Sequence, residues 1–207
     1  MIYRTISLYD LINSEPKIGK DEIKKILSDF SCPLNPDVEY FMREKAYEFE
    51  KANLARTYLV YAQPKSKEPL LVGIYALGHS DIEVDRKLSR NQKRKIFGTT
   101  YALGKRLTTL LIGQLSKNYT DNNNQYITGD ILLSLAFSRI GEIHKIFPSV
   151  VTHIDCKDDP NLRKFYEKHG FQLFKKKEND MLVYLTPTSQ IIKNLAENED
   201  TKNQTID

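Results

Sequence analysis

Apolar positions along the chain follow two periods, and each period predicts one type of element. Ile23, Ile26, Leu27 and Phe30 recur at helical spacing, which predicts a helix over about 21–30. Short alternating or continuous apolar runs predict strands instead. By these criteria we expect strands at 2–8, 56–63, 70–78, 108–115 and 150–156, helices at 21–30, 36–49, 129–145 and 160–169, and a final hairpin of 171–174 with 181–185.

Proline and glycine mark the ends of several of these elements. Pro36 and Pro160 stand where a helix begins, a position that tolerates the missing backbone N–H. Pro148 ends the long helix before it, and Gly170 is placed to end the last one. The resulting order is β-α-α-β-β-β-α-β-α-β-β. It predicts an α/β fold, with one mixed sheet (α+β in character) covered by helices.

Length and composition exclude several classes of protein. A chain of 207 residues fits one ordinary domain, and we predict a single domain over 1–187 followed by a polar C-terminal tail, 188–207, partly disordered or helical. Cys32 and Cys156 are far apart, which excludes a disulfide scaffold. The longest uncharged run near the middle is too short to cross a bilayer, and the N-terminus resembles no signal peptide. We therefore expect a cytoplasmic protein without membrane contact.

Positive charge is concentrated in one stretch. From residue 86 to residue 120 there are nine basic residues and no acidic one, although the whole chain has a net charge of only +4. Such a stretch attracts a polyanion, which can be RNA, DNA or a phosphorylated cofactor. A solvated loop explains the same charge pattern. Residues 80–106 show no strong periodicity, and we expect a long loop there, with room for a short helix.

A second feature is a strand, a polar loop and a helix in succession. The strand ends in Leu111-Ile112-Gly113-Gln114-Leu115, and Ile127-Thr128-Gly129-Asp130 opens the helix. Unpaired backbone N–H groups and the helix dipole at such an N-terminus favour an anion such as a pyrophosphate. Gly129 allows close approach of the backbone. The asparagines 122–124 tolerate unusual backbone angles, whereas the Asp130 carboxylate would repel phosphates.

A third feature resembles a family motif. The residues are Asp159-x-x-Leu162-x-x-Phe165-Tyr166-x-x-x-Gly170-Phe171. Together with the strand-loop-helix segment and the element order, they resemble the GNAT superfamily of acyl-CoA-dependent N-acyltransferases over residues 1–187, and in particular a bacterial and phage branch with a basic insert before the fourth strand. The family pattern has asparagine at Asp159 and alanine at Leu162. Its loop pattern has Gln or Arg at Asn124 and glycine at Ile127, so only Gly129 matches there.

The resemblance implies a GNAT-like fold and a function. The protein would be an acetyl-CoA-dependent N-acetyltransferase that passes the acetyl group to a primary amine by direct attack in a ternary complex. Acetyl-CoA would be a co-substrate, with its pantetheine arm on the backbone of the strand near Gln114. The residues implied in its binding are Gln114, Leu115, Lys117, Asn124, Ile127, Thr128, Gly129, Asp130, Asp159 and Tyr166.

The resemblance also implies catalytic residues. Tyr166 matches the family tyrosine that protonates the leaving thiolate, and a phenol is protonated at neutral pH. Asp155 lies on the fifth strand, where a polar residue can face the acceptor amine. His153 on the same strand, and His79, Asp81 and Glu83 after the third, remain alternatives for the base. The histidines show no metal-binding spacing, and we predict no metal site.

The acceptor and the partners stay open. The amine can belong to a small molecule, a protein or an aminoacyl-tRNA, and in the last case the basic segment 86–106 would hold the RNA. Phe97 and Tyr101 within it would stack on bases or anchor the segment to the core. A homodimer is compatible with the sequence. The alternative function is a non-catalytic GNAT-like module that binds nucleic acid or a protein partner.

Overall fold

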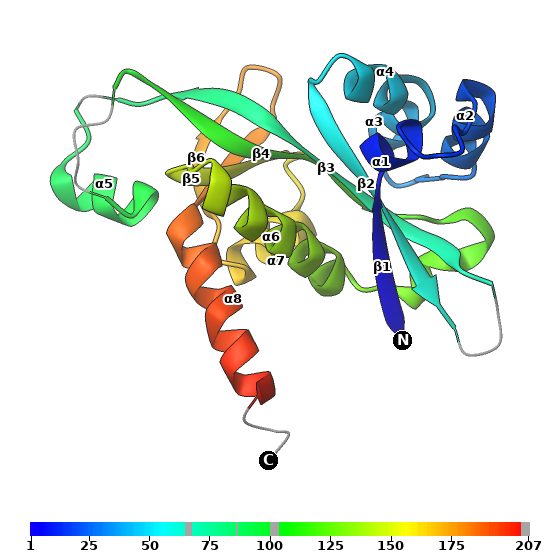
Figure 1. The fold of residues 1–207 in the computed structure, drawn as a ribbon. Helices are drawn as coiled ribbons and strands as arrows, with labels where there is room; N and C mark the ends of the chain where they lie inside the picture. Colours follow the sequence, from blue (N-terminus) through cyan, green and yellow to red (C-terminus); the bar gives the residue numbers. More distant parts are fainter. Residues whose placement is uncertain (65–67, 86, 100–103, 204–207) are drawn as a thin grey trace. The chain divides into compact units, whose positions relative to one another are not determined.

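The computed structural model describes all residues except 65–67, 86, 100–103 and 204–207 (Figure 1). Its strands are β1 (Ile2–Ser7), β2 (Ala55–Gln63), β3 (Leu70–Glu83), β4 (Arg106–Lys117), β5 (Val151–Cys156), β6 (Gln172–Lys176) and β7 (Leu182–Pro187). Its α-helices are α1 (Leu8–Ile12), α2 (Lys20–Ser28), α3 (Pro36–Tyr40), α4 (Ala46–Lys51), α5 (Arg90–Phe97), α6 (Gly129–Ile146), α7 (Pro160–Lys168) and α8 (Thr188–Asn203). A π-helical turn, η1 (Phe41–Lys45), joins α3 to α4, and a 3₁₀ segment, η2 (Thr120–Tyr126), follows β4.

The strands form one mixed sheet in the order β1-β2-β3-β4-β5-β7-β6. Neighbours β1, β2 and β3 are antiparallel, and so are β5 and β7, and β6 and β7. Strands β4 and β5 are parallel, with Leu110–Ile112 opposite Thr152–Ile154. The predicted mixed α/β fold is confirmed.

The described chain divides into two compact units. The first consists of Met1–Gly78 and Gly113–Ala136, and the second of His79–Ile112 and Phe137–Asp207. Because β3 and β4 each contribute to both units, the division follows no single point in the sequence. The prediction of one domain over 1–187 is untested by this division and stays a prediction.

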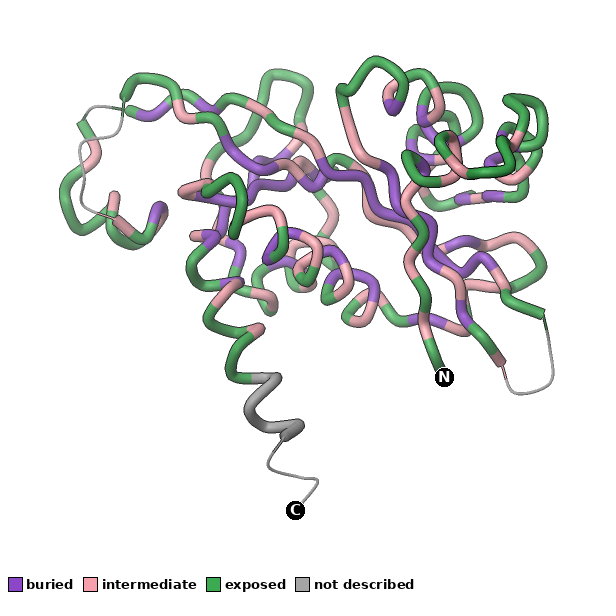
Figure 2. The backbone as a smooth tube through the Cα atoms, in the orientation of Figure 1, coloured by how far each residue is buried: buried purple, intermediate pink, exposed green. Residues whose placement is uncertain are grey.

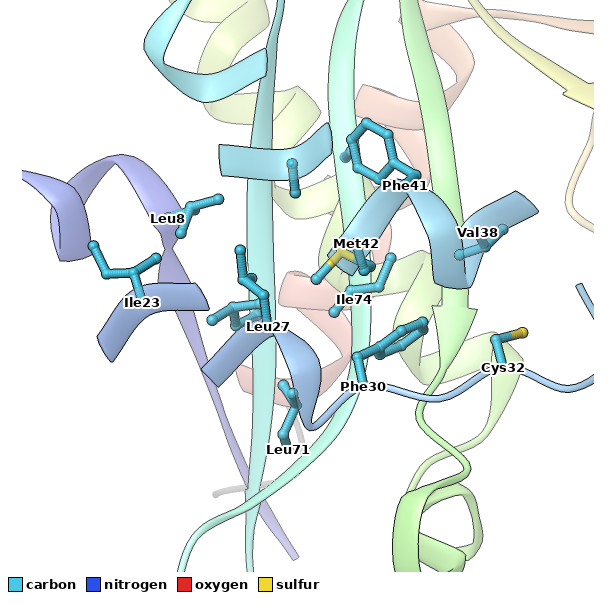
Figure 3. Close-up of a cluster of buried hydrophobic side chains, with 13 residues drawn as sticks. Leu8, Ile23, Leu27, Phe30, Cys32, Val38, Phe41, Met42, Leu71 and Ile74 are labelled. Carbon is cyan, nitrogen blue, oxygen red and sulfur yellow. The ribbon is translucent and has the colours of Figure 1, made fainter. Parts of the chain in front are cut away.

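The core of the first unit lies where α2 and the α3–η1–α4 segment pack on the sheet (Figure 3). Ile23, Leu27 and Phe30, the helical face predicted from the sequence, are each at most 1% exposed. They meet Met42 of η1 and Ile74 of β3, both fully buried. Burial of such side chains stabilises the fold by about 1.5–3 kcal/mol each.

The core of the second unit includes a residue from the basic segment. Phe97 of α5 is 2% exposed and packs with Val151, Val183 and Leu185. Helix α5 begins with a capping box of Ser89 and Gln92 and ends at Gly98 in the left-handed region. The expectation of a long loop over 80–106 was therefore wrong in part, because β3 continues to Glu83 and the short helix is present.

The C-terminal segment is helical rather than disordered as far as the structure describes it. Helix α8 begins at Thr188, and Ile191 in its first turn is 2% exposed. A Cβ placed on Gly141 of α6 would lie 3.1 Å from Leu195 Cδ1, so α8 packs closely on α6. Buried residues follow the strands of the sheet (Figure 2). In the part of α8 whose burial is described, they lie in its first turn. No helix within the described ranges is both long and apolar enough to span a membrane.

Candidate active site

The candidate site residues fall into two sets, one in each unit. Helix α6, whose N-terminal part up to Ala136 belongs to the first unit, begins at Gly129, as predicted from the sequence. Thr128 caps it, because its hydroxyl accepts a hydrogen bond from Ile131 N at 3.2 Å and its carbonyl accepts one from Leu132 N. The cap side chain thus satisfies one of the free N–H groups of the first turn. Asp130 is exposed beside it.

The loop before α6 is held by a residue that the sequence did not reveal. Asn118 is 1% exposed, and its amide donates to Leu71 O at 2.9 Å. Its side-chain oxygen accepts from Ser31 N and Thr120 N. The sequence predicts that the asparagines 122–124 adopt unusual backbone angles, and Asn122 does so, with a left-handed φ of 61°. A polar residue directly after a strand was the only signal for Asn118.

The remaining cofactor candidates of the first unit differ in what they can offer a ligand. Gln114, Leu115 and Lys117 on β4, and Asn124 on η2, are half-buried. Ile127 is 3% exposed, so its side chain belongs to the core and only its backbone is suited to ligand contact.

In the second unit, Asp159 caps helix α7. Its Oδ1 accepts hydrogen bonds from Asn161 N at 2.8 Å and Leu162 N at 3.0 Å, and Pro160 follows as the first helical residue. Aspartate and asparagine cap helices about equally well, so Asp159 can do what asparagine does at this place in the resembled motif.

Tyr166 lies in the second turn of α7 and is 6% exposed. Its ring contacts the rings of Phe165, Phe171 and Tyr184, at centroid distances of 5.2, 5.8 and 6.3 Å. Burial, and to a lesser degree the nearby Cys156 thiol, raises the pKa of Tyr166 above its usual range. The phenol is therefore protonated at every physiological pH and can act as a hydrogen-bond or proton donor.

Asp155 on β5 is part of a cluster of polar side chains. Its Oδ2 accepts from Lys177 Nζ at 2.6 Å, and its Oδ1 lies 3.8 Å from Nε2 of His153. Burial by itself would raise the pKa of Asp155, but His153 and Lys177 outweigh that effect and the pKa is lowered. Sequence reasoning missed Lys177, because only the folding of the β6–β7 turn brings it to β5.

The other candidate bases make their contacts with residues outside this cluster. Asp81 accepts from the Thr108 hydroxyl at 2.7 Å, and the ring of His79 packs edge-on against Phe147. Glu83 lines an open cavity of about 880 Å³, which also involves Lys87, Lys105, Phe174 and Lys175. Among the described residues, no three His, Cys, Asp or Glu side chains are grouped closely enough to hold a metal ion.

The described part of the basic segment places exposed cations on helix α5 of the second unit. Arg90, Arg94 and Lys95 of α5 are exposed. Phe97 is buried and meets Phe174 at a centroid distance of 6.1 Å, so its stacking role on bases is wrong and its anchoring role is confirmed. Tyr101 lies outside the described residues.

Known proteins resemble this chain in structure but not detectably in sequence. No protein-family model and no curated protein sequence matches the chain. A solved bacterial toxin is similar with a TM-score of 0.66 and 16% identity, over 94% of this chain and 96% of the toxin. The structure of AtaTR bound with acetyl-CoA is similar with a TM-score of 0.63 and 16% identity, over 91% of this chain and 95% of that one. The structure of AtaT complexed with acetyl-methionyl-tRNAfMet is similar with a TM-score of 0.62 and 15% identity, over 92% of this chain and 97% of that one.

These likenesses establish the fold. The chain has the GNAT-type acetyltransferase fold, as the sequence motif predicted, and within it resembles the fold of the AtaT and KacT toxins. The match spans nearly the whole of both chains, so the fold assignment covers both units.

Proposed function

We propose that the protein is an acetyl-CoA-dependent N-acetyltransferase that acts by direct attack of a primary amine in a ternary complex. The observation that carries this proposal is Tyr166, a buried phenol on the helix after β5 in a GNAT-type fold. Solved neighbours include KacT and AtaT with one tyrosine replaced by phenylalanine, which supports a functional tyrosine in this fold.

The first unit offers groups suited to acetyl-CoA. The amide N–H groups of Gly129 and Asp130 open an 18-residue helix, whose dipole favours the pyrophosphate. The backbone of β4 at Gln114, Leu115 and Lys117 would pair with the pantetheine arm as an added strand. When bound, acetyl-CoA supplies an activated acetyl thioester.

In the second unit, Tyr166 would donate its phenolic proton to the departing thiolate sulfur. Its raised pKa keeps the proton in place until charge develops on sulfur. Asp155 would face the acceptor amine from β5. Asp159 would act through the helix that it caps, by fixing the position of Tyr166 on α7.

For the acceptor, we propose the amino group of an aminoacyl-tRNA. The exposed cations of α5 are suited to contact an RNA backbone, and Lys87, Lys105 and Lys175 add positive charge at the cavity that Glu83 and Asp85 also line. AtaT, a neighbour in fold, has been solved with acetyl-methionyl-tRNAfMet.

The test is transfer of labelled acetyl from acetyl-CoA to bulk charged tRNA. We expect label in the N-acetyl-aminoacyl fraction after mild release of the amino acid from the RNA. Uncharged tRNA is the matched control and should take up no label. Tight tRNA binding by a folded protein without any acetyl transfer would instead support the non-catalytic nucleic-acid-binding function.

A further inference from the structure

A buried chain of polar groups crosses three strands of the second unit. Thr109 on β4 and His153 on β5 are each 1% exposed. The Thr109 hydroxyl lies 2.8 Å from the carbonyl oxygen of Ser80 and 2.7 Å from Nδ1 of His153. A carbonyl only accepts, so the hydroxyl proton belongs to the bond with Ser80. His153 Nδ1 must then be the donor to Thr109, which leaves the lone pair of the neutral ring on Nε2.

The lone pair on Nε2 faces a second acceptor. Asp155 Oδ1 lies 3.8 Å from Nε2, and in the described part of the chain this buried oxygen has no hydrogen-bond partner. While the His153 ring is neutral, these two acceptors face each other and both stay unsatisfied. The lowering of the Asp155 pKa by His153 belongs to the protonated ring, whose Nε2–H points to the carboxylate. A proton that arrives on Nε2 turns His153 into a donor toward Asp155 and satisfies both groups. The arrangement is therefore suited to receive a proton.

The other oxygen of Asp155 already holds an ammonium group. Lys177 Nζ lies 2.6 Å from Oδ2, and the Lys177 side chain is 39% exposed. Ion pairs with this much solvent exposure contribute little to stability, so another ammonium can exchange with Lys177 at modest cost. The carboxylate thus connects an ammonium at the solvent side to an imidazole in the interior.

We propose that the acceptor's ammonium group takes the place of Lys177 on Asp155, and that its proton passes through Asp155 to Nε2 of His153. This inference rests on the proposed acetyltransferase function and names its acceptor-amine subsite. Asp155 would be a catalytic residue, because it contacts the amine. His153 acts through Asp155 and is a positioning residue, with Thr109 holding its tautomer.

The ammonium loses one proton to His153 through Asp155 and becomes a neutral amine. The amine nitrogen attacks the thioester carbonyl carbon, the C–N bond forms and the C–S bond breaks. The thiolate leaves with the electron pair and takes a proton from Tyr166. The second amine proton and the proton on His153 are released to solvent and to Tyr166, which restores the enzyme.

The surroundings of the pair fit this role. On β7, the apolar Leu185 and Val183 stand opposite His153 and Asp155, so no second carboxylate competes there. Asp158 in the following turn is paired with Arg163. An ionised carboxylate paired with an ammonium group is a weak base, so a second acceptor behind Asp155 is needed to hold the proton.

The first test is His153→Asn, which keeps a side-chain donor near Thr109 but has no basic nitrogen. With charged tRNA as acceptor, we expect kcat to fall by about 100-fold or more, because general-base assistance is typically worth that much. The affinity for acetyl-CoA should stay unchanged, and kcat should rise steadily with pH as the free amine forms in solution. The control is His144→Asn on α6, whose ring only accepts a bond from Ser149 N.

A second variant, His153→Gly, distinguishes the loss of a basic nitrogen from a structural effect of the His153→Asn substitution. In His153→Gly, added imidazole should restore part of the activity by filling the vacated space, whereas it should not help His153→Asn. Wild-type kcat and pH profile in His153→Asn, or no rescue in a folded His153→Gly, would overturn the inference while leaving acetyl transfer intact. Failure of the proposed function would appear differently, as absence of transfer by the wild-type protein.

The third test addresses the ammonium position. Lys177→Met removes the resident ammonium, so the KM for methionine methyl ester, a primary amine without RNA, should fall several-fold while kcat changes little. The matched control is Lys164→Met, an exposed lysine of α7. An unchanged or higher KM in Lys177→Met would show that acceptor amines do not compete for this position.

Discussion

The backbone N–H of Phe171 donates to the carbonyl oxygen of Tyr166 at 3.1 Å, and the two rings pack with centroids 5.8 Å apart. Gly170 between them has a φ of 84° and donates to Glu167 O at 3.0 Å. This is a Schellman ending of α7, with the hydrophobic contact that often accompanies it. The spacing of tyrosine, glycine and phenylalanine in the motif is therefore a structural requirement that fixes the ring of the proposed acid.

Gly170→Ala tests this relationship. A side chain in the left-handed region costs about 1–2 kcal/mol, so the free energy of unfolding should fall by that amount in denaturant titration. Gly19→Ala is the control for the change in backbone freedom, because nothing lies within 4 Å of the added Cβ and its φ of −66° suits alanine. Only the weaker preference of alanine for the N-cap position of α2 lowers its stability. Equal stability of the two variants would contradict the role given to Gly170.

Replacement of Asp159 separates capping from any role of its charge. Asp159→Ala should lower the free energy of unfolding by about 0.5–2 kcal/mol, because the cap of α7 is lost. Asp159→Asn keeps an acceptor oxygen and should match the wild type in stability and in turnover. Lost turnover in a stable Asp159→Asn protein would mean that the carboxylate itself takes part in the reaction.

Tyr166→Phe tests the proposed acid. We expect kcat to fall by about 10²–10⁴-fold, because the proton donor to the leaving sulfur is removed. Acetyl-CoA affinity and thermal unfolding should change little, since the ring contacts remain. Phe165→Leu serves as the control for ring packing. Undiminished turnover in Tyr166→Phe would remove Tyr166 from the mechanism.

Charge reversal on α5 tests the RNA face. The triple change of Arg90, Arg94 and Lys95 to glutamate should weaken tRNA binding and flatten its dependence on salt concentration, because fewer phosphates are neutralised. Acetylation of methionine methyl ester should persist. The control reverses Lys24 and Lys25 on α2, which belong to the other unit. Equal loss in both variants would point to net charge rather than to this face.

Glu39 provides a pH test of the first unit. Its pKa is lowered, chiefly by the hydrogen bond from Cys32 N, with further help from Ser31 and Arg43 against the effect of burial. A lowered pKa adds stability above the ordinary pKa of glutamate, and this stability is lost as pH falls through the folded-state pKa. Glu39→Gln should thus be less stable than wild type at pH 7, and the difference should shrink below about pH 4. A difference independent of pH would contradict this ionic role.

The long elements were predictable because their signals are local. Each signal lies within a few consecutive residues, as do the apolar face of Ile23, Leu27 and Phe30 and the proline at the start of α7. Helix α5 escaped the periodicity criterion because Phe97 is its one buried residue and cations fill its other faces. Its capping box, Ser89 with Gln92, was a signal that the prediction left unused.

The site was predictable only where its residues lie in a continuous motif. Tyr166, Asp159 and Gly170 were found by spacing, and Asp155 by its place on the fifth strand. Lys177, Thr109 and Asn118 were missed because strand pairing brings them to their partners from distant parts of the chain. The direction of the Asp155 pKa shift depends on such partners, and no local pattern reports it.

The most direct test of the proposed acetyltransferase function is calorimetric titration with acetyl-CoA at moderate salt, for the wild-type protein and for Gly129→Val. We predict saturable one-to-one binding in the micromolar range by the wild type. Binding should be clearly weaker in Gly129→Val, because the added side chain crowds the start of α6. Absence of binding by a folded wild-type protein would contradict the acetyltransferase function. Equal affinity in both proteins would place the pyrophosphate elsewhere.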